Sequence, residues 1–390
     1  MKHERSGEHG ALHDPEQSDL GDHSKAQHKS RLWMKLAVVL LSVLVAVGAA
    51  EVGLRLLTPQ QLGFEYRNGK FVPPRLRPKD ATCNSLGYHD VEHATLAQPD
   101  VRRVVLLGDS YVAAGTMQIP ATPGQRLLHH LNAGSDRQYE VISIGQGGWD
   151  GRTELQAWQA HGAGFSPGVV VTLFLAFNDV ENVSESLSQR AAEQRKILKS
   201  VRPGRTRAGA DEMPFLIFRW SVLNRLISHR LAYFLRDRTP RGIPSTYFVY
   251  ADPHSDEWER AWRTAERIIL ETKQAVTAAG ARYVVVSATT PHGVWGPEEG
   301  LRRLKAVYPG MRESEWNLDK PDQRLARFCR EHDIPFLALE PAFRIETIEN
   351  GRRLHLPING HWNEEGNDLA GRLIAEFLLK LEAGNATPAP

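Results

Sequence analysis

Short hydrophobic runs alternate with amphipathic stretches between residues 101 and 382 of this 390-residue chain. Hydrophobic runs bounded by Gly, Asp or Asn are typical of strands buried on both faces of a sheet. They predict strands at 104–107, 139–144, 169–175, 283–287 and 336–339. Apolar residues that recur every three or four positions are typical of helices packed on a sheet. This spacing predicts helices at 123–132, 153–161, 256–279, 321–332 and 363–381.

The order of these elements predicts the class of fold. Strands that alternate with helices form a mostly parallel sheet with helices on both faces. We therefore expect one α/β domain at 101–382, a three-layer α/β/α structure with a mostly parallel five-stranded sheet. Residues 58–100 are rich in Pro and Gly and are expected to form a linker that packs on this domain. Residues 180–250 are expected to be an insertion whose apolar run at 215–218 caps the site or contacts a membrane.

One apolar stretch near the N-terminus has the character of a membrane anchor. Residues 36–50 contain no charged residue, basic residues precede them, and Trp33 lies at their edge. With its continuation to residue 57, the segment is long enough to cross a bilayer. We therefore expect a transmembrane helix at 32–57 and disordered tails at 1–31 and 383–390.

The charge distribution around this helix predicts its orientation. Basic residues before the span favour a cytoplasmic N-terminus. The chain would then be a single-pass protein of the inner (cytoplasmic) membrane with its α/β domain on the periplasmic, extracytoplasmic side. The alternative is a cleaved signal peptide with the small residues Gly48–Ala50 at its cleavage site. A buried core helix is disfavoured, because the run is apolar on all sides and follows a polar tail.

Composition and charge bear on the class of partner. The chain is 41% hydrophobic and 24% charged, with a formal net charge of +2. This is an ordinary globular composition that gives no reason to expect nucleic acid as a partner. Cys83 and Cys329 match no metal-binding or redox spacing. The histidines of the N-terminal tail follow no metal-ligand spacing either, and we expect neither a metal nor a cofactor.

Three of the predicted strands are followed by residues suited to acyl chemistry. Gly108-Asp109-Ser110 follows the first strand, Gly148 the second and Asn178 the third. Because the carboxyl ends of parallel strands meet at one edge of a sheet, these residues should converge. The N–H groups of Ser110 and Gly148 and the Asn178 amide would form an oxyanion hole beside a serine nucleophile. Each residue alone is also typical of an ordinary turn or helix cap, which does not account for their convergence.

His361 lies on a loop just before the last predicted helix, from which it can return to the same edge of the sheet. An imidazole there can act as the general base for Ser110. A second serine, Ser166, lies in a Gly-x-Ser-x-Gly pattern like a nucleophile elbow. That pattern precedes a predicted strand instead of following one, and Pro167 lacks the N–H group that an elbow contributes. We therefore exclude Ser166 as the nucleophile.

Four sequence blocks, in chain order, resemble the signature of the SGNH (GDSL-type) hydrolase family. The blocks are Gly108–Ser110, Ser143–Gly148, Ala176–Asp179 and Asn359–Gly366. The resemblance spans roughly residues 80–381. With the N-terminal anchor, the chain is similar to the membrane-anchored bacterial members of this family, which implies the flavodoxin-like form of the α/β/α fold.

The resemblance implies a serine esterase or acyl hydrolase that needs no cofactor. Ser110 would attack the ester, His361 would take its proton, Gly148 and Asn178 would help to hold the oxyanion, and Asp109 would support them. Acylated small molecules, or O-acetyl and acyl groups of envelope glycans or lipids, would be the substrates. Two alternatives are a membrane-anchored polysaccharide O-acetyltransferase and a non-catalytic glycan-binding protein with a degenerate site.

The chain departs from the family at the residue that orients the histidine. Asn359 stands where relatives have Asp, and Ile358 lies three residues before His361. Loss of this carboxylate lowers turnover by about 10⁴ in a serine protease. A backbone carbonyl could orient the ring, Glu340 or Glu364 could substitute, or activity could be lost. We expect a Ser–His dyad with Asn359 as a supporting residue.

Overall fold

The computed structural model describes a subset of the chain. The described residues are 33–35, 37–50, 52–53, 65–67, 70–72, 83–96, 98–200, 242–312, 315–356 and 359–384, without the side chains of 65–67, 70–72 and 195–200. The predicted tail at 1–31, most of the predicted linker before residue 83, the apolar run at 215–218 and residues 385–390 lie outside them. So does the central part of the predicted insertion, residues 201–241.

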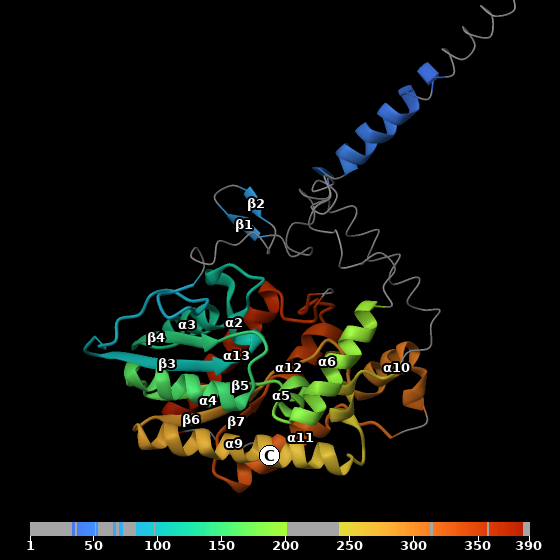
Figure 1. Ribbon diagram of the computed structural model, residues 1–390. Coiled ribbons are helices and arrows are strands. Elements are labelled where there is room, and N and C mark those ends of the chain that lie inside the picture. Colours follow the sequence, from blue (N-terminus) through green and yellow to red (C-terminus); the bar gives the residue numbers. More distant parts are fainter. Residues whose placement is uncertain are drawn as a thin grey trace, which may run out of the picture.

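A five-stranded parallel sheet forms the centre of the α/β domain (Figure 1). The strands are β3 (Val101–Gly108), β4 (Gln138–Gly145), β5 (Val169–Phe174), β6 (Arg282–Ser287) and β7 (Phe336–Ala338). Their order across the sheet is β4-β3-β5-β6-β7, and every neighbouring pair is parallel. The predicted parallel five-stranded sheet is therefore confirmed.

Both faces of the sheet are covered, which explains why its strands are hydrophobic throughout. In β3, Val105 and Leu107 belong to one buried cluster, while Val104 and Leu106 belong to the cluster on the opposite face. All six residues of β5 are buried. Successive side chains of a strand point to opposite faces, so a strand between two helical layers needs apolar residues at every position.

Helices form the two outer layers. One layer consists of α4 (Gly151–Ala160), α9 (Asp256–Ala278) and α11 (Lys320–Glu331). The other consists of α3 (Pro123–Ala133), α12 (Glu340–Ile348) and α13 (Glu364–Glu382). Figure 1 shows α9 below the sheet and α3 above it. This arrangement confirms the predicted three layers.

Four further helices of the described residues surround the sheet. They are α2 (Ser110–Ala113), α5 (Ala176–Asn182), α6 (Glu185–Ser200) and α10 (Pro297–Val307). Before the domain, β1 (Glu65–Arg67) and β2 (Lys70–Val72) pair as a two-stranded antiparallel sheet within the predicted linker. The sequence predicts a helix that starts at Ser110 and partly helical structure within residues 180–250, which agrees with α2 and α6. It predicts none of α5, α10, β1 and β2.

One N-terminal helix is long and apolar enough to cross a membrane. It covers Trp33–Ala50 with a mean hydropathy of 2.2, and none of this window is buried in the described structure. The exposure of its side chains does not support the core-helix alternative. A membrane anchor and a signal sequence both fit this helix.

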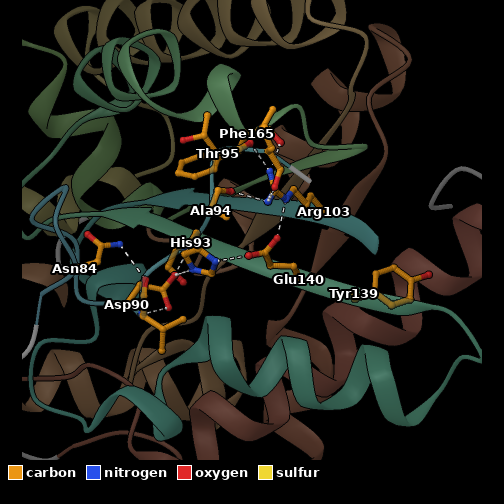
Figure 2. Close-up of polar contacts among 12 residues, drawn as sticks. Asn84, Asp90, His93, Ala94, Thr95, Arg103, Tyr139, Glu140 and Phe165 are labelled. Atoms are coloured by element: carbon orange, nitrogen blue, oxygen red, sulfur yellow. Dashed lines mark hydrogen bonds and ion pairs between the residues drawn. The ribbon is translucent and has the colours of Figure 1, made fainter. Parts of the chain in front are cut away.

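Residues 84–96, which we call the strap, precede β3 in the chain and lie against β3 and β4. Figure 2 shows His93 of the strap between Asp90 and Glu140, with Arg103 on the other side of Glu140. The His93 ring lies 2.7 Å from a Glu140 oxygen and 3.1 Å from an Asp90 oxygen. Arg103 donates to Glu140 at 2.7 Å and also to the backbone carbonyls of three strap residues, Ala94, Thr95 and Leu96.

The carboxylates of this cluster control the ionisation of His93. Burial alone would lower the pKa of His93, but the hydrogen bonds and charges of Asp90 and Glu140 together raise that pKa above its ordinary value. Asp90 also accepts the backbone N–H of Ser143 in β4 at 2.7 Å. The strap is therefore fastened to both strands by buried, charge-assisted hydrogen bonds.

Candidate active site

Ser110 lies in the sharp turn at the carboxyl end of β3. A side chain on Gly108 would come 2.5 Å from Val112 and 3.1 Å from the Leu173 carbonyl, so the turn requires glycine there. Asp109 is the N-cap of α2, and its carboxylate accepts the Tyr111 N–H at 2.9 Å. These constraints hold Ser110 half-buried at the edge of the sheet.

His361 reaches Ser110 from a loop 251 residues further along the chain. Its Nε2 lies 2.7 Å from the Ser110 hydroxyl oxygen. An antiparallel bridge between His355 and Trp362 closes this loop, and Leu356 donates its N–H to the His361 carbonyl at 2.7 Å. The structure thus brings together the serine and the histidine that the sequence analysis selected.

The third strand brings Asn178 to the same place. Asn178 lies in the first turn of α5, and its side-chain amide donates to Asp109 Oδ2 at 2.8 Å. The Ser110 hydroxyl lies 3.3 Å from the same oxygen. Through these two hydrogen bonds the fully buried Asp109 connects the serine to the asparagine. The Asn178 amide has a second N–H, which this bond leaves for another acceptor.

The glycine loop after β4 approaches Ser110 through Gly147. A side chain on Gly147 would lie 3.7 Å from the Ser110 Cβ, whereas one on Gly148 would meet nothing within 4 Å. Gly148 has a φ of +88°, a left-handed conformation that favours glycine. Gly148 was expected at this position and Gly147 was not, although two consecutive glycines after a strand indicate that the backbone comes close to another group.

Burial controls the ionisation of His361. It lowers the pKa of the His361 imidazole, while the nearby charge of Asp109 acts in the opposite direction. A lowered pKa keeps the ring neutral at neutral pH. Only the neutral ring can accept a proton from Ser110.

The residue that orients His361 is not one of the predicted carboxylates. Asn359 Oδ1 accepts the backbone N–H of His361 at 3.2 Å and does not bond to the ring. Glu340 and Glu364 form ion pairs with arginines. The buried Nδ1 of His361 has no hydrogen-bond partner among the described residues, which do not include Ile358.

Two buried carboxyl groups lie behind the site. Glu154 and Asp179 are 3% and 2% exposed, and burial together with the charge of Asp109 raises the pKa of each well above its usual range. Both line a cavity of about 10 Å³, which has room for one water molecule. Asp179 also accepts the Leu175 N–H at 2.7 Å and so supports the turn that presents Asn178.

The two described ends of the predicted insertion meet beside Asn178. Gln194 Oε1 accepts the Ser245 N–H at 2.9 Å. The Tyr247 ring packs edge-on against Phe177, the neighbour of Asn178, at a centroid distance of 5.1 Å. The insertion therefore begins and ends next to Asn178, a residue of the predicted oxyanion hole.

The remaining sequence hypotheses concern Ser166, the cysteines and metals. Ser166 lies before β5, at the opposite end of that strand from Asn178. Cys83 and Cys329 are both free. Within the described part of the chain, no group of three His, Cys, Asp or Glu side chains is placed to hold a metal ion.

Comparison with known proteins finds similarity only among solved structures. No known family model and no curated protein sequence matches the chain. An acetyl xylan esterase structure is 12% identical with a TM-score of 0.39, over 72% of this chain and 98% of the esterase. A GDSL-like lipase from Bacteroides thetaiotaomicron is 12% identical with a TM-score of 0.37, over 74% and 93%. A lipase/acylhydrolase from Enterococcus faecalis is 13% identical with a TM-score of 0.34, over 74% and 99%. Because these TM-scores are below 0.5, the function of this chain must be argued from its own residues.

Proposed function

We propose that this protein is a serine esterase that uses a Ser110–His361 dyad. The observation that carries the proposal is the 2.7 Å separation of Ser110 Oγ and His361 Nε2, which lies within hydrogen-bond reach. The half-buried serine stands at the carboxyl edge of a parallel sheet, where open α/β folds bind ligands. A glycan-binding protein would have no need for a half-buried, neutral imidazole against a serine hydroxyl.

Acylation begins when Ser110 Oγ attacks the ester carbonyl carbon while His361 Nε2 takes the hydroxyl proton. The carbonyl oxygen becomes an oxyanion. The N–H groups of Ser110 and Gly148 and the second amide N–H of Asn178 stabilise it. His361 then gives its proton to the departing alcohol, and the acyl group remains on Ser110.

Deacylation repeats these steps with water as the nucleophile. His361 takes a proton from water, which attacks the acyl-enzyme, and the acid leaves as the proton returns to Ser110. Asp109 acts as a positioning residue throughout, because it fixes the Asn178 amide at 2.8 Å. Its charge also stabilises the imidazolium that forms in both halves of the reaction.

The location of the site suggests its class of substrate. The helix at Trp33–Ala50 and the basic residues before it favour an anchor with the α/β domain on the periplasmic side of the inner membrane. The proposed substrates are therefore acylated small molecules or the O-acetyl and acyl groups of envelope glycans or lipids.

Hydrolysis of p-nitrophenyl acetate by the full chain in detergent tests this function. We expect Ser110→Ala and His361→Ala each to lower kcat/KM by at least about 10³. Ser166→Ala is the matched control, since it removes a hydroxyl at the opposite end of the sheet and should leave the rate unchanged. Equal rates in Ser110→Ala and wild type would refute the proposal. Acetate transfer that requires a glycan acceptor would instead indicate a transferase.

A further inference from the structure

Tyr111 connects the segment that carries Ser110 to the loop that carries His361. Its backbone N–H is bound to Asp109, and the residue is 5% exposed. The Tyr111 ring centroid lies 5.0 Å from that of His361, with the two planes tilted by 35°. The same ring lies edge-on to Trp362 at 4.8 Å. Tyr111 therefore packs directly against the proposed base.

The hydroxyl of Tyr111 holds the loop as well as the ring. It lies 3.0 Å from the carbonyl oxygen of Gly360, the residue before His361, and 3.0 Å from that of Thr289. Burial raises the pKa of the Tyr111 phenol well above its usual range, so the hydroxyl remains a donor. Gly360 has a φ of +77°, and the bond to its carbonyl therefore supports a backbone conformation that favours glycine.

Buried residues around Tyr111 complete a rigid frame for this loop. Thr289 Oγ1 accepts the Trp362 indole N–H at 2.8 Å and lies 3.0 Å from His355 Nε2. Thr289 and Trp362 are 0% and 2% exposed. His355 and Trp362 are also the pair that closes the loop. The frame fixes the backbone on both sides of His361.

A histidine base must be held in the correct plane and tautomer, and a carboxylate bonded to Nδ1 ordinarily does this. Here no described carboxylate reaches that nitrogen. We propose that Tyr111 is the positioning residue of this site, whose ring and hydroxyl hold His361 against Ser110 in place of a carboxylate. The inference rests on the proposed esterase function, in which His361 is the base.

Tyr111→Phe in the full chain tests the role of the hydroxyl, because it keeps the ring and removes the bond to Gly360. We expect kcat for p-nitrophenyl acetate to fall by about tenfold with KM unchanged, since a displaced base slows proton transfer without loss of substrate contacts. Tyr111→Leu also removes the ring. It should lower kcat by about 100-fold and shift the acid limb of the pH–rate profile upward, towards about 6.5, as water reaches His361.

Tyr283→Phe is the matched control. It removes another buried hydroxyl, bonded to Thr172 at 3.0 Å, from a residue of β6 outside the site. Its kcat and pH profile should equal those of wild type. A Tyr111→Phe variant with the kcat and pH profile of Tyr283→Phe would overturn the inference.

Nitrogen NMR of histidine-labelled protein separates this inference from the esterase function. The His361 resonance, assigned with His361→Gln, should report one tautomer in wild type, protonated at Nδ1. In Tyr111→Phe we expect a mixture of tautomers. If wild type shows one tautomer and Tyr111→Phe a mixture, but wild type cleaves no ester, the esterase function is refuted and the positioning role of Tyr111 is retained. Identical tautomers and titration in both proteins would refute the positioning role whether or not the ester is cleaved.

Discussion

At the scale of single residues, Asp109 links the serine, the asparagine and the histidine of the site. It caps the turn that carries Ser110, accepts the Asn178 amide and influences the ionisation of His361. Ser110, Asn178 and His361 could be selected from the sequence, because each follows a strand or precedes a helix at the same sheet edge and each lies in a block that resembles one hydrolase family. Tyr111 could not be selected, since a buried tyrosine has the pattern of a core residue until its contact 249 residues away is known.

Asp109→Asn tests the electrostatic part of this role. The Asp109 charge raises the pKa of His361, so its removal lowers that pKa further below 6.5. The base form then persists to lower pH, and the acid limb of kcat/KM should move to lower pH. We also expect kcat to fall by about 100-fold, because the imidazolium loses its counter-charge. A pH–rate profile from pH 4 to 9 measures both effects, and an acid limb that stays in place or moves upward would contradict the assignment.

At the scale of elements, the strands were predictable and several short helices were not. Each central strand is buried on both faces, which produces an apolar run that stands out in the sequence. In contrast, β7 passes into α12 directly, with Leu339 as the N-cap and no polar turn between them, so the predicted strand extended one residue too far. The strap has no periodicity at all. Its position depends on His93 and Asp90, which bond to Glu140 and Ser143 of β4, and on the strap carbonyls that accept from Arg103 of β3.

His93→Gln tests how the strap contributes to stability. The pKa of His93 is raised in the folded protein, so its contribution is fully present below about 6.5 and is lost as pH rises through the folded pKa. We expect the variant to lose roughly 1–2 kcal/mol at pH 6 and clearly less at pH 9. Urea denaturation at both pH values measures this difference. His129→Gln, at an exposed histidine of α3, is the control. Equal losses at both pH values for His93→Gln would contradict the charged network.

At the scale of the whole molecule, the strand order assembles the site. Because β3 lies between β4 and β5, Ser110 is flanked by the glycine loop of one neighbour and by Asn178 of the other. The loop after α12 returns His361 to the same edge. The sequence predicted a parallel sheet and the convergence of these residues, but not which strand is central. That order depends on side-chain packing between segments far apart in the chain, which no local pattern records.

The most direct test of the central claim is fluorophosphonate labelling of the full chain in detergent, with the adduct located by peptide mass spectrometry. We predict a single adduct on Ser110 that is retained in Ser166→Ala and lost in His361→Ala, because only a serine with a base at 2.7 Å is activated. A folded protein that forms no adduct on Ser110, or that keeps the adduct without His361, would contradict the Ser110–His361 dyad.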